Sequence, residues 1–217
     1  MNKLYNANTT SKNRFFADIH DKKVLDVGCG TGNISSYLKE SNNKCFGITY
    51  SQKEADLAEQ VMEEVIVDDI ENIQVLPFEF GYFDIIIFAD ILEHLRDPWA
   101  TLKVFTPYLS HDGEIIASIP NIANFKIRKH LLFGKFEYKE FGILDNTHLR
   151  FFNLHSARDL ILSAELSIVS EDYSFWNWKF PSLIQRILGS KEYNLRRYIT
   201  RKWPNLFATQ FVLRGKK

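Results

Sequence analysis

Three glycines at alternate positions, Gly28, Gly30 and Gly32, form the part of this sequence whose residue types and spacing point most directly to chemistry. They follow an apolar run, residues 24–27, that carries a single carboxylate, Asp26. Glycine allows positive φ and lets a small molecule approach the backbone without a Cβ in its way. The segment after the loop has helical apolar spacing. Strand, glycine loop and helix together predict a ligand site at the carboxyl edge of a parallel sheet.

The spacing of the glycines distinguishes two classes of cofactor loop. The nicotinamide fingerprint is Gly-x-Gly-x-x-Gly, with an acid about 20 residues further on. Here the spacing is Gly-x-Gly-x-Gly, position 33 is Asn, and the next strand ends in Thr49 rather than in an acid. A dinucleotide oxidoreductase is therefore the least favoured of the function classes that we consider.

The elements that must position this loop alternate along the chain. Short apolar runs predict further strands, and residues 82–88 read as a strand buried on both faces. A capping box at Ser51 and Glu54 predicts the start of one helix, and Asp97 before Pro98 predicts the start of another. This order predicts an α/β fold, a Rossmann-like, mostly parallel sheet with helices on both faces. The predicted strands after the first are residues 44–48, 65–67, 82–88, 113–119, 166–173 and 205–213.

Length and charge are consistent with one ordinary domain. The chain has 217 residues, with 27 basic and 27 acidic side chains, so a single domain over residues 1–217 is expected and no charge excess indicates a nucleic acid partner. Its core would be residues 20–120 and 153–217, with an acceptor-binding insertion at 121–152, because so long a connection is usually functional. The two cysteines, no signal-peptide pattern and no apolar run of about 20 residues favour a reduced, cytoplasmic protein without membrane insertion.

The glycine loop resembles motif I of class I S-adenosylmethionine (SAM)-dependent methyltransferases, Asp-x-Gly-x-Gly-x-Gly. Residues 92–98, 118–121, 144–152 and 204–211 follow in an order similar to a subgroup encoded with bacterial O-antigen, capsule and other glycan-assembly enzymes. The resemblance implies SAM as cofactor and S-adenosylhomocysteine as product. It also implies a seven-stranded sheet whose C-terminal strand is antiparallel.

The resemblance also implies where the cofactor contacts lie. Asp26 shapes the loop and reaches the methionine amine, Tyr50 and Ile70 enclose the adenine, and Asp69 accepts from its exocyclic amine. Thr49 stands where an acid usually holds the ribose, a loss of about 1–2 kcal/mol. Tyr50 read as a helix-entry aromatic and Asp69 read as part of a solvated turn are the alternatives. The full expected set is Asp26, Gly28, Cys29, Gly30, Gly32, Thr49, Tyr50, Asp69, Ile70, Ala89 and Asp90.

Transfer of methyl to an alcohol also requires loss of a proton. A positioned base contributes about 10²–10⁴-fold, and histidine is the usual choice near neutral pH. We favour His148, in the loop expected to lie over the emerging methyl group, with Asp145 orienting it or gripping a sugar hydroxyl. His94 is the other candidate, and these side chains can instead only pin the loop. No metal is expected, although Asp90 with Asp145 and Asn146 loosely resembles the magnesium ligands of catechol-type methyltransferases.

Two stretches combine aromatic and basic side chains. Lys126, Arg128, Lys129 and Lys135 can meet phosphates, and neighbouring aromatics can stack on a sugar or base. Residues 174–204 are a helical hairpin packed on the sheet, a lid or homodimer contact, or a face for an acidic membrane. The leading function is O-methylation of a sugar or glycan precursor, including nucleotide- or phosphate-linked ones, in surface polysaccharide biosynthesis. A methyltransferase of small phosphorylated metabolites and a non-catalytic SAM-binding protein are the alternatives.

Overall fold

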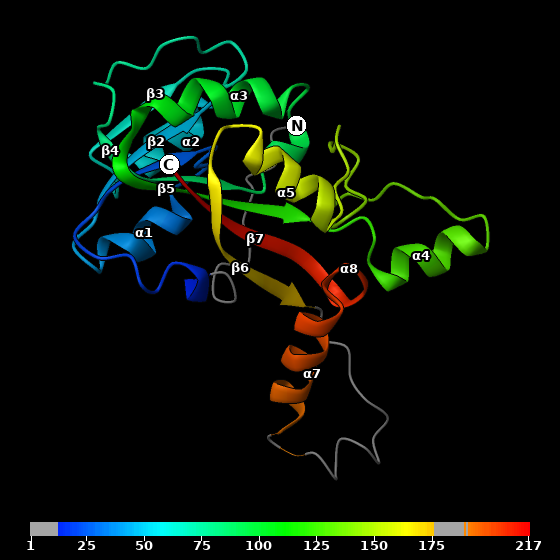
Figure 1. Ribbon diagram of the computed structural model, residues 1–217. Helices are drawn as coiled ribbons and strands as arrows, with labels where there is room; N and C mark the ends of the chain where they lie inside the picture. The colour runs from blue at the N-terminus through cyan, green and yellow to red at the C-terminus, as the bar shows by residue number, and fades with distance from the viewer. Residues whose placement is uncertain (1–12, 176–188, 190) are drawn as a thin grey trace.

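Seven strands form one sheet in the order β3-β2-β1-β4-β5-β7-β6 (Figure 1). The computed structural model describes residues 13–175, 189 and 191–217. Pairing from β3 through β5 is parallel, whereas β7 lies antiparallel between β5 and β6. This topology confirms the predicted fold class, including the antiparallel C-terminal strand. The strands are β1 Lys23–Val27, β2 Lys44–Thr49, β3 Glu64–Val67, β4 Phe83–Ala89, β5 Leu109–Pro120, β6 Ser167–Phe175 and β7 Ala208–Lys216.

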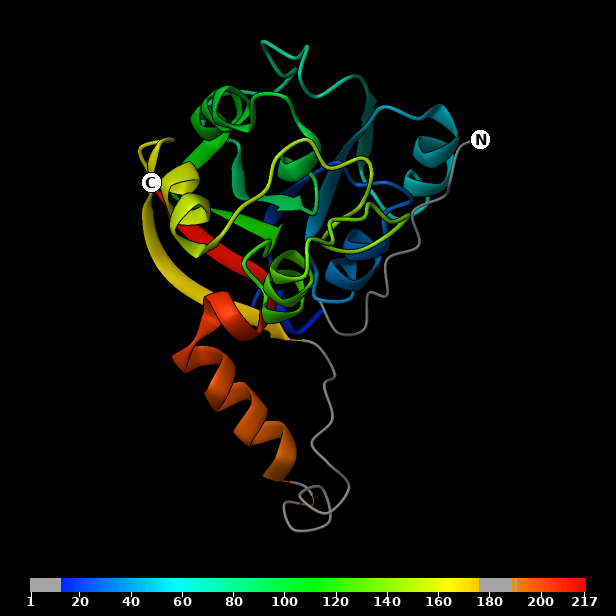
Figure 2. The same ribbon diagram turned by 90° about the vertical axis from the view of Figure 1, so that its right-hand side faces the viewer.

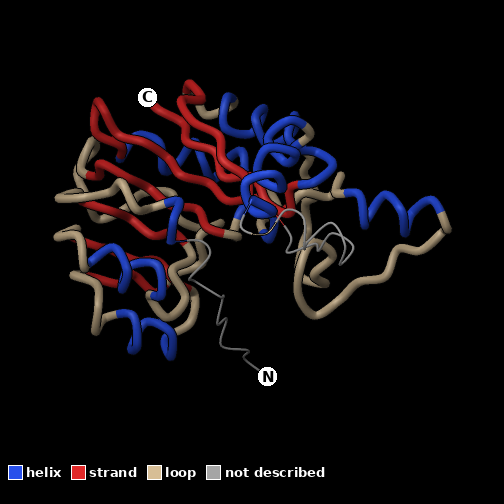
Figure 3. The backbone as a smooth tube through the Cα atoms, turned by 90° about the horizontal axis from the view of Figure 1, so that it is seen from below, coloured by secondary structure: helices blue, strands red, loops and turns tan. Residues whose placement is uncertain are grey.

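Helices cover both faces of the sheet, as the tube trace in Figure 3 shows. Leu38 of α1 and Ala58 of α2 pack on one face with Val24 and Ile87, and Leu102 of α3 and Ile161 of α5 pack on the other. The helices are α1 Asn33–Lys39, α2 Gln52–Ala58, α3 Pro98–Phe105, α4 Phe125–Leu132, α5 Leu154–Leu162, α7 Lys191–Lys202 and α8 Pro204–Phe207, with short 3-10 turns η2 Asn13–Phe15, η3 Leu92–His94 and η4 Thr106–Tyr108.

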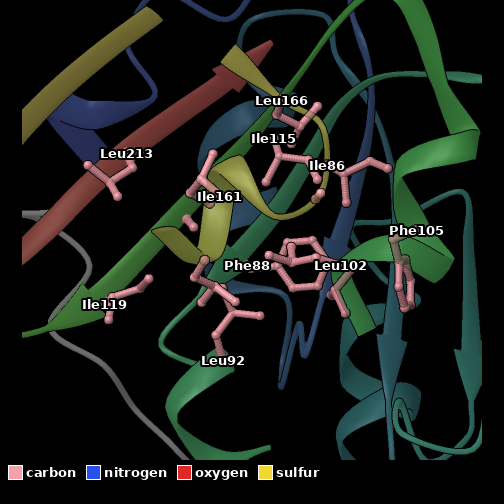
Figure 4. Packing of buried hydrophobic residues seen from close by; sticks show 14 of the residues in the cluster. Ile86, Phe88, Leu92, Leu102, Phe105, Ile115, Ile119, Ile161, Leu166 and Leu213 are labelled. Carbon is pink, nitrogen blue, oxygen red and sulfur yellow. The ribbon is translucent and has the colours of Figure 1, made fainter. Parts of the chain in front are cut away.

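The larger of the two apolar layers lies under α3 and α5. Ile86 and Phe88 of β4 point into it with Ile115 of β5, next to Leu102 and Phe105 of α3 (Figure 4). All five side chains are fully buried. Full burial of a side chain of this size stabilises the folded state by roughly 1.5–3 kcal/mol. This packing therefore holds β4, whose carboxyl end carries part of the candidate site, in place on the sheet.

Two local expectations are wrong. The capping box is not formed, because Ser51 makes no side-chain cap and the Glu54 carboxylate accepts instead from the Thr49 hydroxyl. The last strand begins at Ala208 rather than at residue 205. Pro204 is the first residue of α8, and its fixed φ suits the start of a helix, so the chain makes one helical turn before it enters the sheet.

The predicted insertion leaves the sheet after β5 and returns just before α5. Its two ends are joined, since the Ile122 amide donates to the Phe152 carbonyl at 2.9 Å. In Figure 1, α4 extends away from the sheet on one side, and Figures 1 and 2 both show α7 projecting from the body. Part of the predicted basic stretch, residues 176–188 and 190, lies outside the described residues. In the described part of the chain, no helix has the length and apolar character needed to cross a membrane.

Candidate functional site at the carboxyl ends of β1, β2 and β4

The glycine loop has the backbone that its sequence requires. Gly28, Gly30 and Gly32 have φ of 77°, 53° and 80°. A Cβ at Gly28 would meet the Ile91 side chain at 2.8 Å, and one at Gly32 would meet Val61 at 2.9 Å. A Cβ at Gly30 would meet nothing within 4 Å. Two of the glycines therefore allow the loop to pack, and the middle one borders open space.

The loop is tied to the neighbouring strand. The amides of Gly28 and Cys29 both donate to the Ile48 carbonyl at 2.9 Å. Below them Asp26 is 1% exposed, and its carboxylate lies 3.5 Å from the Ser35 hydroxyl. Burial raises the pKa of Asp26 to about 7. An acid in this environment favours a nearby cation, because a positive charge would offset the loss of hydration.

The raised pKa of Asp26 predicts a pH-dependent stability. Between the unfolded value of 3.8 and about 7, the folded state holds the proton more tightly, so stability falls as the pH rises through this window. Between pH 5 and pH 8 the free energy of unfolding of the ligand-free protein should fall by about 3 kcal/mol because of Asp26. Chemical denaturation at both pH values measures it, and Asp26→Asn should remove most of the difference. An equally steep pH dependence in Asp26→Asn would contradict the assignment to Asp26.

The end of β2 carries a hydrogen-bonded pair where one acid was expected. The Thr49 hydroxyl donates to the Glu54 carboxylate at 2.8 Å, and both side chains are buried. Tyr50, the next residue, is 74% exposed. The Glu54 carboxylate therefore lies within hydrogen-bonding distance of Thr49, close to where the expected acid would stand. The exposed ring of Tyr50 lies at the same end of β2.

The residues expected around the adenine lie in different surroundings. Ile70 is 8% exposed and belongs to the larger apolar layer. The exposed Asp69 accepts from the Glu71 amide and from the Asn72 side chain, both at 3.1 Å. These hydrogen bonds are the ones that the solvated-turn alternative for Asp69 implies. To bind adenine as well, the Asp69 carboxylate would have to accept a further hydrogen bond from the ligand.

Asp90 occupies a strained position at the end of β4. Its φ is 56°, unusual for a residue with a Cβ. Its Oδ1 accepts from the Ser118 hydroxyl and from the Gln210 amide, both at 2.5 Å. Three strands, β4, β5 and β7, therefore meet at this carboxylate. Ala89 beside it is half-buried, so both residues line the edge that was expected to face the methionine tail.

Two predicted histidines and one acid come together just past β4. The rings of His94 and His148 pack edge to face with centroids 4.7 Å apart. His148 Nε2 lies 3.9 Å from Glu93 Oε1. His148 and Glu93 are buried and His94 is half-buried. Burial, and then the repulsion that would arise between two protonated rings, lower the pKa of His148, so its surroundings favour the neutral imidazole.

Asp145 holds this cluster through Thr147. Its Oδ1 accepts from the Thr147 hydroxyl at 2.6 Å and from the Thr147 amide at 2.9 Å, whereas His148 Nδ1 faces the Ile143 carbonyl at 3.1 Å. Burial acts to raise the pKa of Asp145, but the Thr147 hydrogen bonds outweigh it and the pKa is lowered. The bond that orients the His148 ring is therefore the one to Ile143, and Asp145 shapes the turn before it.

Glu54, Glu93 and Gln210 also lie in the candidate site, and the sequence did not single them out for it. Glu93 lies between Leu92 and His94 of a motif that the sequence had already marked. An acid directly after an apolar residue in that motif was the signal that could have pointed to it. Glu54 was assigned to a cap that does not form. Gln210 reaches Asp90 across 120 residues, and no local pattern reports such a contact.

The residues present fit the expected cofactor. SAM carries an α-ammonium group at its methionine end, a sulfonium in the middle and a flat adenine at the other end. The open space at Gly30 and the buried carboxyl of Asp26 suit the amino acid end, whereas the exposed Tyr50 ring offers an aromatic face of the kind on which a flat base stacks.

Comparisons with known proteins agree with this geometry. Residues 3–171 match a family described as a methyltransferase domain. The chain is 33% identical over 94 residues to norajmaline N-methyltransferase of Rauvolfia serpentina, covering 38% of this chain and 32% of the relative. It is 30% identical over 116 residues to ubiquinone biosynthesis O-methyltransferase of Coxiella burnetii, covering 52% and 49%. The chain thus spans about a third to a half of these curated relatives.

Solved structures show the same fold at low identity. A possible histamine N-methyltransferase from Thermotoga maritima superposes with a TM-score of 0.62 at 20% identity, over 94% of this chain and 86% of that one. A putative methyltransferase from Bacillus halodurans gives 0.63 at 15% identity, over 95% and 97%. At these identities the likeness concerns the fold alone.

Proposed function

Since the chain belongs to the methyltransferase-domain family, we propose that it transfers a methyl group from SAM to a hydroxyl oxygen of a sugar or glycan precursor. The observation that carries the proposal is the His94–His148 pair, which lies just past β4 beside Glu93. The predicted methyltransferase class and its SAM cofactor are confirmed at the level of the family.

A path of aromatic rings leads away from the histidines into the insertion. His148 lies 6.4 Å from Phe151, Phe151 lies 6.2 Å from Phe136, and Phe136 lies 5.4 Å from Tyr138, centroid to centroid. Phe136 and Tyr138 are 42% and 57% exposed. Such rings stack on the apolar faces of sugars, so they support an acceptor that runs from the cluster along the insertion.

The same insertion carries basic side chains, on α4 and on the residues after it. Arg128, Lys129, His130 and Lys135 are exposed. Arg128 also donates to the Ala123 carbonyl at 2.6 Å, which holds its guanidinium beside the start of the helix. Charge-assisted bonds from such groups favour phosphate, so the combination supports a sugar linked to a phosphate or nucleotide.

The chemistry asked of the protein is positioning and removal of a proton. SAM supplies a methyl group on a sulfonium. The acceptor O–H bond breaks and its proton passes to solvent. The oxygen–methyl bond forms as the methyl–sulfur bond breaks, and that electron pair stays on sulfur. The His94–His148 pair activates the hydroxyl, and Asp145 positions the pair through Thr147. Alignment of the acceptor oxygen can supply several kcal/mol.

The Thr49–Glu54 pair is proposed to replace the expected ribose acid. Glu54→Gln keeps the shape and removes the charge, so we expect SAM affinity to fall about tenfold, the size of one charge-assisted hydrogen bond. Isothermal titration calorimetry measures it. Glu59→Gln, an exposed residue at the end of the same helix, is the matched control and should bind SAM like the wild type. Equal affinity in both variants would exclude Glu54 from the cofactor site.

The acceptor class is tested with methyl-labelled SAM and a panel of hydroxyl compounds. We expect label in nucleotide sugars or sugar phosphates, and much less in the same sugars without phosphate. Label in small phosphorylated metabolites that lack a sugar would favour the metabolite alternative. Label in none of these, from a protein that binds SAM, would favour the non-catalytic alternative.

A phenolic hydroxyl is the second candidate acceptor. The similarity to ubiquinone biosynthesis O-methyltransferase and the ring path from His148 to Tyr138 both suit an aromatic acceptor. Phenols therefore belong in the same panel. Transfer to a phenol and to none of the sugars would replace the glycan proposal with this one.

A homodimer and a cytoplasmic location complete the proposal. The described part of the second basic stretch, α7, projects from the body (Figure 1) and exposes Tyr193 and Tyr198. Aromatic side chains are enriched in the cores of interfaces, which supports a contact between copies there. Sedimentation velocity of the purified chain distinguishes a dimer from a monomer.

A further inference from the structure

We propose that Glu93, His94 and His148 bind a divalent transition-metal ion of the Zn²⁺ type, and that the acceptor hydroxyl binds to that ion. The three side chains each offer one ligand atom, and these atoms lie within 4.8 Å of one another. From the sequence no metal is expected, and the loose resemblance to a magnesium site concerns a different set, Asp90 with Asp145 and Asn146. The inference rests on the proposed function, because it names how the histidine pair activates the hydroxyl.

The hydrogen bonds of the His94 ring select its tautomer. The Thr147 hydroxyl donates its proton to Asp145 at 2.6 Å, so it can only accept from His94 Nδ1, which lies 3.1 Å away. The Thr147 carbonyl, 3.2 Å from the same nitrogen, is also an acceptor. His94 Nδ1 therefore carries a proton, so in the neutral imidazole the lone pair that a metal ion would bind is on Nε2.

His148 is fixed in the same way. Its Nδ1 lies 3.1 Å from the Ile143 carbonyl, which can only accept. The remaining lone pair is on Nε2, the atom that lies 3.9 Å from Glu93 Oε1. Metal-binding histidines characteristically donate their second ring N–H to a carbonyl or carboxylate, because this sets the tautomer and the ring orientation. Both histidines of the cluster have this arrangement.

The backbone also holds together the two segments that carry these three residues. The Glu93 carbonyl accepts from the amides of Leu149 and Arg150 at 2.8 and 3.0 Å, which ties η3 to the loop that carries His148. A tetrahedral ion with bonds of about 2.0–2.1 Å separates its ligand atoms by roughly 3.4 Å. The 3.9 Å between His148 and Glu93 needs only a small rotation to reach that value.

The donor set indicates the kind of ion and its role. Two imidazoles and one carboxylate suit zinc and its neighbours, whereas magnesium prefers oxygen ligands and keeps several waters. Three protein ligands leave a coordination position open, as in catalytic zinc sites. One carboxylate leaves the ion a net positive charge, which lowers the pKa of a bound hydroxyl. The hydroxyl proton passes to solvent, and the oxygen becomes the nucleophile for the methyl carbon.

Cobalt binding followed by visible absorption tests the site without any methyl acceptor. The wild-type protein, stripped of metal with a chelator, should bind one Co²⁺ per chain, Zn²⁺ should displace it, and Mg²⁺ should not. Glu93→Gln and His94→Ala should each bind Co²⁺ at least tenfold more weakly. His94 is half-buried, so His94→Ala serves if the buried Glu93→Gln fails to fold. His111→Ala, at an exposed position in β5, is the matched control and should bind like the wild type.

The metal inference and the proposed function fail in different ways. Co²⁺ affinity unchanged in both cluster variants, displacement by Mg²⁺, or an equal loss in His111→Ala would overturn the metal site. Calorimetry with SAM on the same samples reports separately on the cofactor. A protein that binds Co²⁺ through this cluster but does not bind SAM would contradict the proposed function and leave the metal site standing.

Discussion

Gly30→Val is expected to abolish SAM binding while the protein remains folded. The position has φ of 53°, and a Cβ there would point into space with no protein atom within 4 Å. The branched side chain would occupy the space assigned to the methionine end of the cofactor. A loss of at least 100-fold in affinity, measured by calorimetry, is the expected size, since the substitution removes the site rather than one hydrogen bond.

Backbone strain is the confounding effect, and Gly81→Val controls for it. Gly81 also has positive φ, 77°, and a Cβ there makes only ordinary contacts, with a nearest atom at 3.8 Å. Gly81 lies just before the amino end of β4, whereas the candidate site lies at the carboxyl ends of the strands. Both variants share a strain of about 1–3 kcal/mol, which thermal denaturation reports. Wild-type SAM affinity in a folded Gly30→Val would remove the cofactor assignment.

His148→Ala is expected to lower turnover about 10²-fold or more, with little change in SAM affinity. The substitution removes one of the two imidazoles that lie against Glu93 past β4. It leaves the glycine loop and the Thr49–Glu54 pair in place. Steady-state kinetics on the labelled acceptor gives the turnover, and calorimetry gives the affinity.

A second histidine distinguishes this effect from a general loss of stability. His155 is 86% exposed and pairs with Asp159 within α5. His155→Ala should therefore turn over like the wild type. Near-normal turnover in His148→Ala together with a large loss in His94→Ala would contradict the role given to His148 and assign activation of the hydroxyl to His94 alone.

The sequence predicted the parts of the site that a short stretch specifies. The loop from Gly28 to Gly32 needs positive φ, which glycine supplies locally. The antiparallel position of β7 and the alternation of strands and helices are also as predicted. Each of these features depends on residues that are neighbours along the chain or on a family pattern that covers the whole fold.

The parts that were not predicted depend on side-chain contacts that the spacing of residues along the chain does not determine. Glu54 was read as a cap because Ser51 precedes it at the right spacing, but its carboxylate accepts from Thr49. Asp145 was expected to orient His148, whereas the oriented nitrogen faces the Ile143 carbonyl. The approach of Glu93 to His148 joins residues 55 positions apart, and sequence spacing carries no information on it. The role of His148 and the glycan acceptor remain predictions.

The most direct test of the central claim is the position of the methyl group in the product. The protein is incubated with SAM carrying a ¹³C methyl group and with the nucleotide sugar or sugar phosphate that accepts the label, and the product is examined by carbon–proton correlation NMR. We predict that the ¹³C methyl is bonded to an oxygen of the sugar ring, and that Gly30→Val yields no labelled product. A ¹³C methyl bonded to nitrogen or carbon, or an equal yield from Gly30→Val, would contradict the account.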